Sequence, residues 1–341
     1  MINIIKKYYL AWETNDLELL KSVVTTPIFG VRTYLEEKLF TNEELHMTFN
    51  SNKLKTVEIL SYKSDKEVTK LELKIDDIPV SARIVIQDDK VYKVYEIVKT
   101  NMRRFKCVCS YDGSPFSGYQ KQLNAPSVQE TIETAIQKAF KQDNISIHSS
   151  GRTDKGVHAI NQIFHFDIET SIETDRIKMI LNTYLPDSIF VKSTEEVDCT
   201  FHSRYDVKEK EYMYKINTKE YDPIQRNHEW FVAGLDIAKL NKDLREIIGT
   251  HDFTSFTKTT TKSATRTIYN AFVTEEKNYL YIHIKGSGFM RYMVRNIVGV
   301  LVAINQGKLQ YSIKELIEKK DVNTLNDKAP ASGLYLYNVN Y

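Results

Sequence analysis

The stretch Gly151-Arg152-Thr153-Asp154-Lys155-Gly156-Val157-His158 places one acid between two cations, in a loop predicted between two strands. Glycines in such a loop permit positive φ and the close approach of a ligand. We expect Arg152 and Lys155 to favour the ionised form of Asp154 and to be able to bind phosphate. Three interpretations are open: a solvated turn, a metal-assisted phosphoryl site, or a single ionised carboxylate acting without metal. The metal-assisted site needs further carboxylates, and none is clustered nearby in the sequence.

Length and composition limit the class of protein. The chain has 341 residues, of which 42% are hydrophobic and 27% charged, so it can form two or three domains with apolar cores. No run approaches the roughly 18 apolar residues of a membrane span, and the first residues lack a signal-peptide cleavage pattern. Three cysteines suit a reducing compartment. Cys107 and Cys109 share one face of a strand, and without a second ligand pair they indicate core packing rather than a metal site.

The chain changes character near residue 100. Arg32 and Arg83 are the arginines before residue 102, and ten follow; Gly30 is the one glycine before it, and eleven follow. The net charge of +2 divides into −1 for residues 1–101, with 15 Lys plus Arg against 16 Asp plus Glu, and +3 for the remainder. We therefore predict a domain boundary between residues 101 and 102.

The first hundred residues predict a small α+β domain. Apolar spacing indicates two helices within residues 4–24, followed by strands near residues 57–60, 68–75, 80–86 and 91–98 that form one curved antiparallel sheet. This order resembles the cone-shaped fold of nuclear transport factor 2 and the SnoaL-like cyclases. His46 is the one histidine here, and no Asp/His pair stands out, so a binding or dimerising module is favoured over an enzyme. Its near-neutral charge argues against a major RNA-binding role and favours a protein or small-molecule partner.

The remaining chain predicts two α+β lobes, about 102–200 and 201–341, with a cleft between them. Strands are expected at residues 104–109, 145–148, 162–168, 212–216 and within 269–284. Helices are expected from residue 127 to 140, with Ser127 and Glu130 as a capping box, and at 235–248, 291–305 and 313–319.

Eight motifs in this part lie in the order and spacing of one enzyme family. They are Tyr111–Gln120, Ser127–Glu130, Gly151–His158, Phe201–Arg204, Lys210–Tyr214, His251–Phe256, Gly288–Gly299 and Ala329–Tyr335. Together they resemble the tRNA pseudouridine synthase A family over about residues 103–341. The resemblance implies a two-lobed pseudouridine synthase fold with a mixed or antiparallel sheet.

The resemblance also implies an activity. Members isomerise uridine to pseudouridine in the tRNA anticodon stem-loop, at positions 38–40, without metal or organic cofactor. The family's catalytic aspartate corresponds to Asp154, the tyrosine that stacks on the target base to Tyr212, and the basic partner of the aspartate to Arg295. A base must leave its stack before its glycosidic bond is accessible.

Further residues correspond to substrate contacts. Arg152 matches the arginine that helps to displace the target nucleotide, and Phe289 is expected to line the uracil pocket. Lys155, His158 and Arg204 are further candidates for substrate binding. Cations expected to contact the RNA backbone are Arg103, Arg104, Lys121, Arg204, Lys208, Lys210, Lys258, Lys262, Arg266 and Arg291. The chain departs from the usual pattern at Tyr119, where tryptophan is common, and at Lys155, where alanine is common.

The family resemblance further implies a cytoplasmic homodimer that binds tRNA. Three alternatives remain: a non-catalytic tRNA-binding protein, an independent activity or ligand for residues 1–101, and action on other RNAs. Intact Asp154, Tyr212 and Arg295 oppose the first of these.

Overall fold

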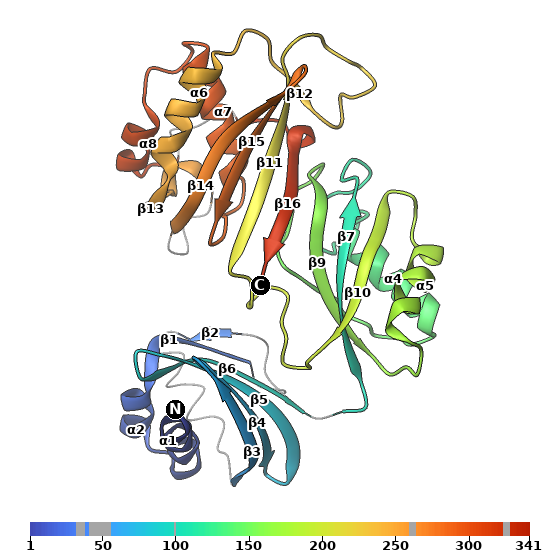
Figure 1. Cartoon of the computed structure of the whole chain (residues 1–341), viewed down its shortest axis with the longest axis vertical. Coiled ribbons are helices and arrows are strands. Elements are labelled where there is room, and N and C mark those ends of the chain that lie inside the picture. The colour runs from blue at the N-terminus through green and yellow to red at the C-terminus, as the bar shows by residue number, and fades with distance from the viewer. Residues whose placement is uncertain (32–37, 41–55, 99, 259–263, 323–327) are drawn as a thin grey trace. The chain divides into compact units, whose positions relative to one another are not determined.

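The chain folds into two compact units in the computed structural model, which describes residues 1–31, 38–40, 56–98, 100–258, 264–322 and 328–341 (Figure 1). The small unit comprises residues 1–102 with 198–201, and the large unit comprises residues 103–197 with 202–341. Among the helices in these ranges, none has the length and apolar character that a membrane crossing requires.

The small unit begins with the two predicted helices, α1 (Ile2–Thr14) and α2 (Leu17–Val23). Asp16 separates them because its side chain accepts the Leu19 backbone N–H at 2.9 Å and so caps α2. The face of α1 that carries Ile5, Tyr8 and Trp12 is buried in an apolar core. This confirms the helical pattern predicted for residues 4–24.

The small unit's sheet has six strands in the order β2-β1-β6-β5-β4-β3. Their bounds are β1 (Val24–Val31), β2 (Lys38–Phe40), β3 (Val57–Asp65), β4 (Val68–Ile75), β5 (Ile78–Gln87) and β6 (Lys90–Val98). The four predicted strands β3 to β6 form the expected antiparallel meander. The sequence pattern did not predict β1, which pairs in parallel with β6, or β2. His46 lies outside the described residues.

The large unit is built on one ten-stranded sheet. Eight strands follow the order β10-β7-β9-β16-β11-β15-β14-β13, and β12 and β8 pair with β11 and β9. Their bounds are β7 (Arg103–Tyr111), β8 (His148–Ser149), β9 (His158–Ile168), β10 (Ile189–Val197), β11 (Glu209–Asn217), β12 (Trp230–Phe231), β13 (Gly249–Asp252), β14 (Thr265–Glu276), β15 (Tyr279–Gly286) and β16 (Leu334–Asn340). One sheet therefore runs through both predicted lobes, and the unit is α+β.

Helices cover both ends of this sheet. They are α4 (Val128–Phe140), α5 (Thr174–Tyr184), α6 (Ile237–Leu244), α7 (Met293–Asn305) and α8 (Ile313–Lys319), with short 3₁₀ turns at Arg245–Ile247, Thr254–Phe256 and Ala331–Gly333. Figure 1 shows α4 and α5 beside β7 and β10, and α6 to α8 at the end formed by β13 to β15. Ser127 caps α4 by accepting the Glu130 N–H at 3.2 Å, which is one of the two bonds of the predicted capping box.

The core of the large unit includes the cysteine pair. Cys107 and Cys109 are fully buried on β7, as predicted from their shared face, and burial raises the pKa of the Cys107 thiol to about 12. Both thiols therefore stay protonated and pack as small apolar groups at neutral pH.

Candidate active site

The site is organised around the loop of residues 150–157, which joins β8 to β9. Its first half is held by Gln162, a fully buried residue of β9. The Gln162 amide N–H donates to the Gly151 carbonyl at 2.8 Å, and its oxygen accepts the Ser150 hydroxyl at 2.6 Å. Because a buried amide with both ends satisfied has one favourable orientation, Gln162 fixes where the loop begins.

The middle of the loop is held through Thr153 by the motif of residues 111–120. The Tyr119 N–H donates to the Thr153 carbonyl at 3.1 Å, and the Tyr111 and Thr153 hydroxyls share a hydrogen bond of 2.8 Å. A Cβ at Gly118, where φ is +117°, would lie 3.2 Å from the Thr153 oxygen, so this approach requires glycine. Tyr119, which replaces the common tryptophan, is buried and packs near the Tyr111 ring.

His158 supports the end of the loop. Its Nδ1 accepts the Gly113 N–H at 3.0 Å, and its Nε2 donates to the Asn227 carbonyl at 2.8 Å. The ring stacks on Tyr335 at 4.8 Å, and burial lowers the pKa of His158. Both ring nitrogens thus have protein partners, so the geometry favours a structural role over the substrate contact expected from the sequence.

Asp112, His158 and His228 offer ligand atoms within 4.8 Å of one another. The Asp112 carboxylate lies 3.2 Å from Nδ1 of His158 and 3.9 Å from Nε2 of His228. A metal at this position would compete with the Gly113 N–H for the same lone pair of His158. The existing hydrogen bonds therefore explain why these residues lie together: they support the loop of residues 150–157.

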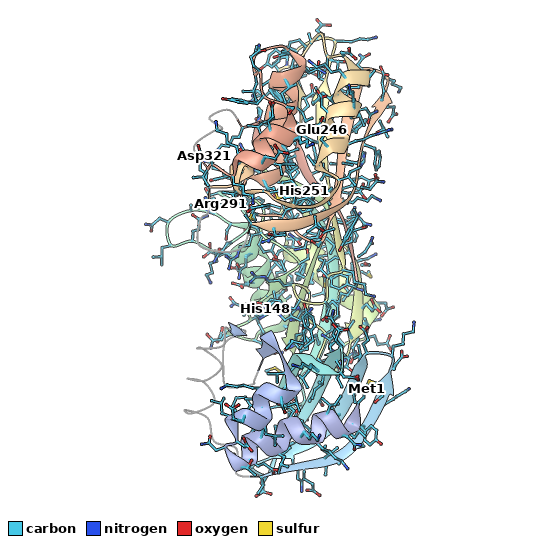
Figure 2. All side chains as sticks on the ribbon, turned by 90° about the vertical axis from the view of Figure 1, so that its left-hand side faces the viewer. Met1, His148, Glu246, His251, Arg291 and Asp321 are labelled. Carbon is cyan, nitrogen blue, oxygen red and sulfur yellow. The ribbon has the colours of Figure 1, made fainter. Side chains whose placement is uncertain are left out.

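Asp154 faces cations that come from the opposite half of the unit. Its carboxylate lies 3.7 Å from the Arg295 guanidinium and 3.9 Å from that of Arg291. Partial burial raises the pKa of Asp154, and the charges of Arg295, Arg291 and Lys328 oppose that rise. Figure 2 labels Arg291 in the C-terminal half of the unit, and His148 marks the N-terminal half.

The two loop cations that were predicted to keep Asp154 ionised, Arg152 and Lys155, are not the ones that face its carboxylate. Arg152 and Lys155 are exposed, and within the described ranges neither forms an ion pair with Asp154. Lys155 lies in the turn that the Val157 N–H closes on the Asp154 carbonyl, and the charge nearest to Arg152 is that of Arg204, whereas the Arg295 guanidinium lies 3.7 Å from the Asp154 carboxylate. The expectation that the flanking cations hold the charge of Asp154 was therefore wrong in its choice of residues.

Arg295 is fixed before any substrate binds. It lies near the start of α7 and is 9% exposed. Its Nε donates to the Ala329 carbonyl at 2.8 Å, and the Ala329 N–H donates back to the Arg295 carbonyl at 3.0 Å. Helix α7 begins after Tyr292, a residue in the left-handed region with φ of +65°. The Nε bond to Ala329 therefore orients the guanidinium, and the backbone bond between the same two residues holds Ala329 in place.

The sequence analysis did not identify Tyr292, whose aromatic ring lies close to the three cations that face Asp154. Lys328 Nζ lies 4.1 Å from the centroid of Tyr292, and the guanidinium carbons of Arg291 and Arg295 lie 4.8 and 5.7 Å from it. Such contacts stabilise a cation over an aromatic face. The proximity of Tyr292 to Arg291 and Arg295 in the sequence is a weak signal for this arrangement, and nothing in the sequence pointed to Lys328.

Tyr212 provides an aromatic surface next to Asp154. It lies on β11 between β15 and β16, where it pairs with Ile284 and Leu336. Its ring meets the edge of Phe289 at 5.1 Å and 85°. Burial and the charge of Asp154 both raise the pKa of Tyr212, so its hydroxyl stays protonated. The structure thus brings Asp154, Tyr212, Arg295 and Phe289 together.

Several cations expected to contact RNA are instead paired with acids. Arg103 lies 2.6 Å from Glu196, Arg104 makes two bonds of 2.6–2.7 Å to Asp167, and Lys121 lies 3.5 Å from Glu133. For these three the structure favours a structural interpretation. Lys262 lies outside the described residues. Arg204 is exposed, with its guanidinium 5.3 Å from the Tyr205 ring.

Comparison with known proteins identifies the family of the chain. The family model described as tRNA pseudouridine synthase matches residues 108–206 and 244–341. The chain belongs to the tRNA pseudouridine synthase family. It is 41% identical over 244 residues to tRNA pseudouridine synthase A of Geobacillus kaustophilus, which covers 70% of this chain and 95% of the relative. It is 42% identical over 245 residues to tRNA pseudouridine synthase A 1 of Bacillus cereus strain ATCC 14579, covering 70% and 99%.

The similarity to solved structures covers a smaller share of the chain. The chain is similar to an NTF2-like protein of Cytophaga hutchinsonii with 17% identity and a TM-score of 0.25, over 29% of this chain and 94% of that one.

Proposed function

We propose that this protein isomerises uridine to pseudouridine in the anticodon stem-loop of tRNA, at positions 38–40. Membership of the family and the names of its relatives support this reaction. The observation that carries the proposal is the meeting of Asp154, Arg295 and Tyr212 from three separate elements. A turn with only a structural role would not require a half-buried carboxylate that faces a fixed guanidinium and an aromatic ring.

We propose a role for each of these groups. Asp154 promotes cleavage of the bond between C1′ of the ribose and N1 of uracil, and Arg295 stabilises its charge. Tyr212 and Phe289 hold the detached uracil by stacking while it rotates, a contact that contributes about 1–3 kcal/mol per base. C1′ then bonds to C5, the C5 proton leaves, and N1 gains a proton. The atoms balance without a cofactor, so we propose that none takes part.

Arg152 is proposed either to occupy the space that the displaced nucleotide leaves in the RNA or to hold a phosphate that flanks it. It is exposed, in the same loop as Asp154 and two residues before it. Extruding a base costs a few kcal/mol, and a cation at that position offsets part of the cost. Lys155, also exposed, extends the positive surface of the loop.

The test uses an anticodon stem-loop transcript of tRNA with chelator present. We expect the wild-type protein to form pseudouridine, measured by mass spectrometry of RNA fragments, and Asp154→Asn to bind the RNA without converting it. Asp143→Asn, a change at an exposed aspartate outside the site, serves as the matched control. If the wild type makes no pseudouridine while Asp154→Asn binds equally well, the binding-only alternative holds. Pseudouridine outside tRNA in modification maps would support the other-RNA alternative.

We further propose a cytoplasmic homodimer in which residues 1–101 form a separate domain that binds a protein or small-molecule partner. The described part of the small unit packs an apolar core of residues from α1, α2 and the sheet. Light scattering of the full chain is expected to give twice the 39.7 kDa of one copy. A monomer mass at micromolar concentration would refute the dimer.

A further inference from the structure

Three cations gather beside the loop that carries Asp154. Arg152 belongs to that loop, the Lys210 ammonium donates to the Ser150 carbonyl of the loop, and Arg204 follows closely after His202, whose ring lies 5.2 Å from that of His148 on β8, just before the loop. Burial lowers the pKa of Lys210, partial loss of hydration lowers that of the exposed Arg152, and the charge of Arg204 lowers both further. None of the three forms an ion pair with a carboxylate in the part of the chain that the structure describes. Grouped like charges without a counter-ion destabilise the free protein, and a bound anion would remove that cost.

Lys210 is positioned against the backbone of the loop. It lies two residues before Tyr212, so both side chains emerge on the same face of β11. Its ammonium donates to the Ser150 carbonyl and lies 3.0 Å from where a Cβ of Gly151 would be. An ammonium carries three N–H groups, and Ser150 accepts one of them. The glycine therefore lets the charge approach the loop while two donors are left for a ligand or water.

Arg204 is held by an aromatic contact. Its guanidinium lies over Tyr205, whose ring packs 4.4 Å from His202, and the backbone N–H of Arg204 donates to Nδ1 of His202 at 3.1 Å. Stacking orients the plane of a guanidinium and leaves its N–H edge available for a planar or tetrahedral anion. Arg204 is thus an exposed, oriented donor next to a half-buried one, Lys210.

We infer that Lys210, Arg204 and Arg152 form a binding site for one backbone phosphate of the RNA strand that carries the target uridine. This inference rests on the proposed function, since it places the phosphate next to the base that Asp154 receives. A phosphodiester is the anion that this RNA offers, and its oxygens can accept from a guanidinium fork and an ammonium together. The loop position of Arg152, two residues before Asp154, fits a phosphate directly adjoining the target nucleoside.

The first test replaces Arg204, which has no described hydrogen bond to the loop. We expect Arg204→Met to weaken binding of the stem-loop about tenfold. The slope of log K against log salt should fall by about 0.7, the value for one phosphate contact on single-stranded nucleic acid. Lys138→Met, an exposed cation on α4, is the matched control and should leave the slope unchanged. An unchanged slope for Arg204→Met would overturn the site.

The second test changes the RNA. A methylphosphonate, which lacks the phosphate charge, is placed at each loop phosphate in turn. One position should weaken wild-type binding about tenfold, and at that position Arg204→Met should add little further loss, because both changes remove the same interaction. Additive losses at every position would overturn the inference. Pseudouridine formed by the wild type on the unmodified stem-loop tests the proposed function separately, so each idea can fail alone.

Lys210 gives a pH readout. Its pKa of about 8 in the free protein means that it loses its charge as the pH rises through 8, and a bound phosphate would favour the charged form. Binding should therefore weaken about tenfold between pH 7 and pH 9. Tyr212 stays neutral because its pKa is raised, and Glu211 faces the other side of β11, where it contacts His283 and Lys285. Lys210→Arg should bind the stem-loop with little pH dependence. If the pH profile of binding for Lys210→Arg were identical to that of the wild type, the role of Lys210 would be refuted.

Discussion

Gly113 is the position where a single methyl group should displace the active-site loop. A Cβ built there would lie 2.5 Å from the carbonyl carbon of Val157, and closer still to its oxygen. Carbon atoms in contact sit about 3.5 Å apart, so Gly113→Ala demands a shift of about 1 Å. Gly113 is not in the left-handed region, which means that the substitution tests crowding and not backbone strain.

The size of the effect follows from the two interactions that change. Forcing extra volume into a packed site costs about 1–3 kcal/mol, and losing the bond from the Gly113 N–H to His158 costs about 0.5–1.5 kcal/mol. We therefore expect the free energy of unfolding to fall by about 1.5–4.5 kcal/mol. Val157 is three residues from Asp154 and bonded to it through the backbone, so Asp154 should move with it. A displacement of about 1 Å costs about 10²-fold in rate.

The assay follows tritium released from C5 of uridine in a single turnover, beside a thermal melt of each protein. Gly288→Ala is the matched control because nothing lies within 4 Å of its Cβ position. That variant should match the wild type or gain slightly in stability. Equal stability and rate for Gly113→Ala and Gly288→Ala would refute the argument, as would a rate loss of the same size in both.

Three further expectations concern charge, helix capping and thiol exposure. Arg295→Gln removes a cation that opposes the raised pKa of Asp154, so the acid limb of the pH–rate profile should move to higher pH. Arg295→Lys should return that limb to the wild-type pH. Acid limbs at the same pH in all three proteins would exclude this ion pair. Ser127→Ala removes the cap of α4 and should lower the free energy of unfolding by about 1 kcal/mol, seen as a lower Tm; a rise in Tm would contradict it. Iodoacetamide at pH 8 should label the partly exposed Cys199 and leave Cys107 unmodified, because Cys107 is buried and its pKa is about 12. Peptide mass mapping of the native protein checks this. Modified Cys107 in native protein would contradict the expected protection.

Local patterns in the sequence were sufficient for the elements whose partners are near in the chain. The alternation of Leu71 and Leu73 in β4 and the helical spacing of α1 were predicted because a half-buried strand and a half-buried helix impose periods of 2 and 3.6. The loop of residues 151–158 was also found, because its glycines and charges are unusual together.

Contacts between distant segments could not be read from periodicity. Strand β16 was not predicted, since its polar residues interrupt a simple alternation and its parallel partner β9 lies far back in the chain. The pairing of Arg295 with Asp154 came from the family resemblance, and spacing alone gives no reason to choose it. His158 and Arg104 carried charge or ligand potential in the sequence, and only their hydrogen-bond and ion-pair partners, Asn227 and Asp167, revealed a supporting role.

Strand β16 has a consequence for the biosynthesis of the protein. It lies between β9 and β11, joined to β9 through Tyr335 with His158 and Leu336 with Ala159, yet it follows both strands in the chain (Figure 1). During translation β9, which follows Asp154, and β11, which carries Tyr212, therefore both emerge before β16, the strand that connects them. A nascent chain that stops before residue 334 has every proposed catalytic group but lacks the connecting strand. Activity is therefore expected to appear late in synthesis and in one step, after β16 has left the ribosome.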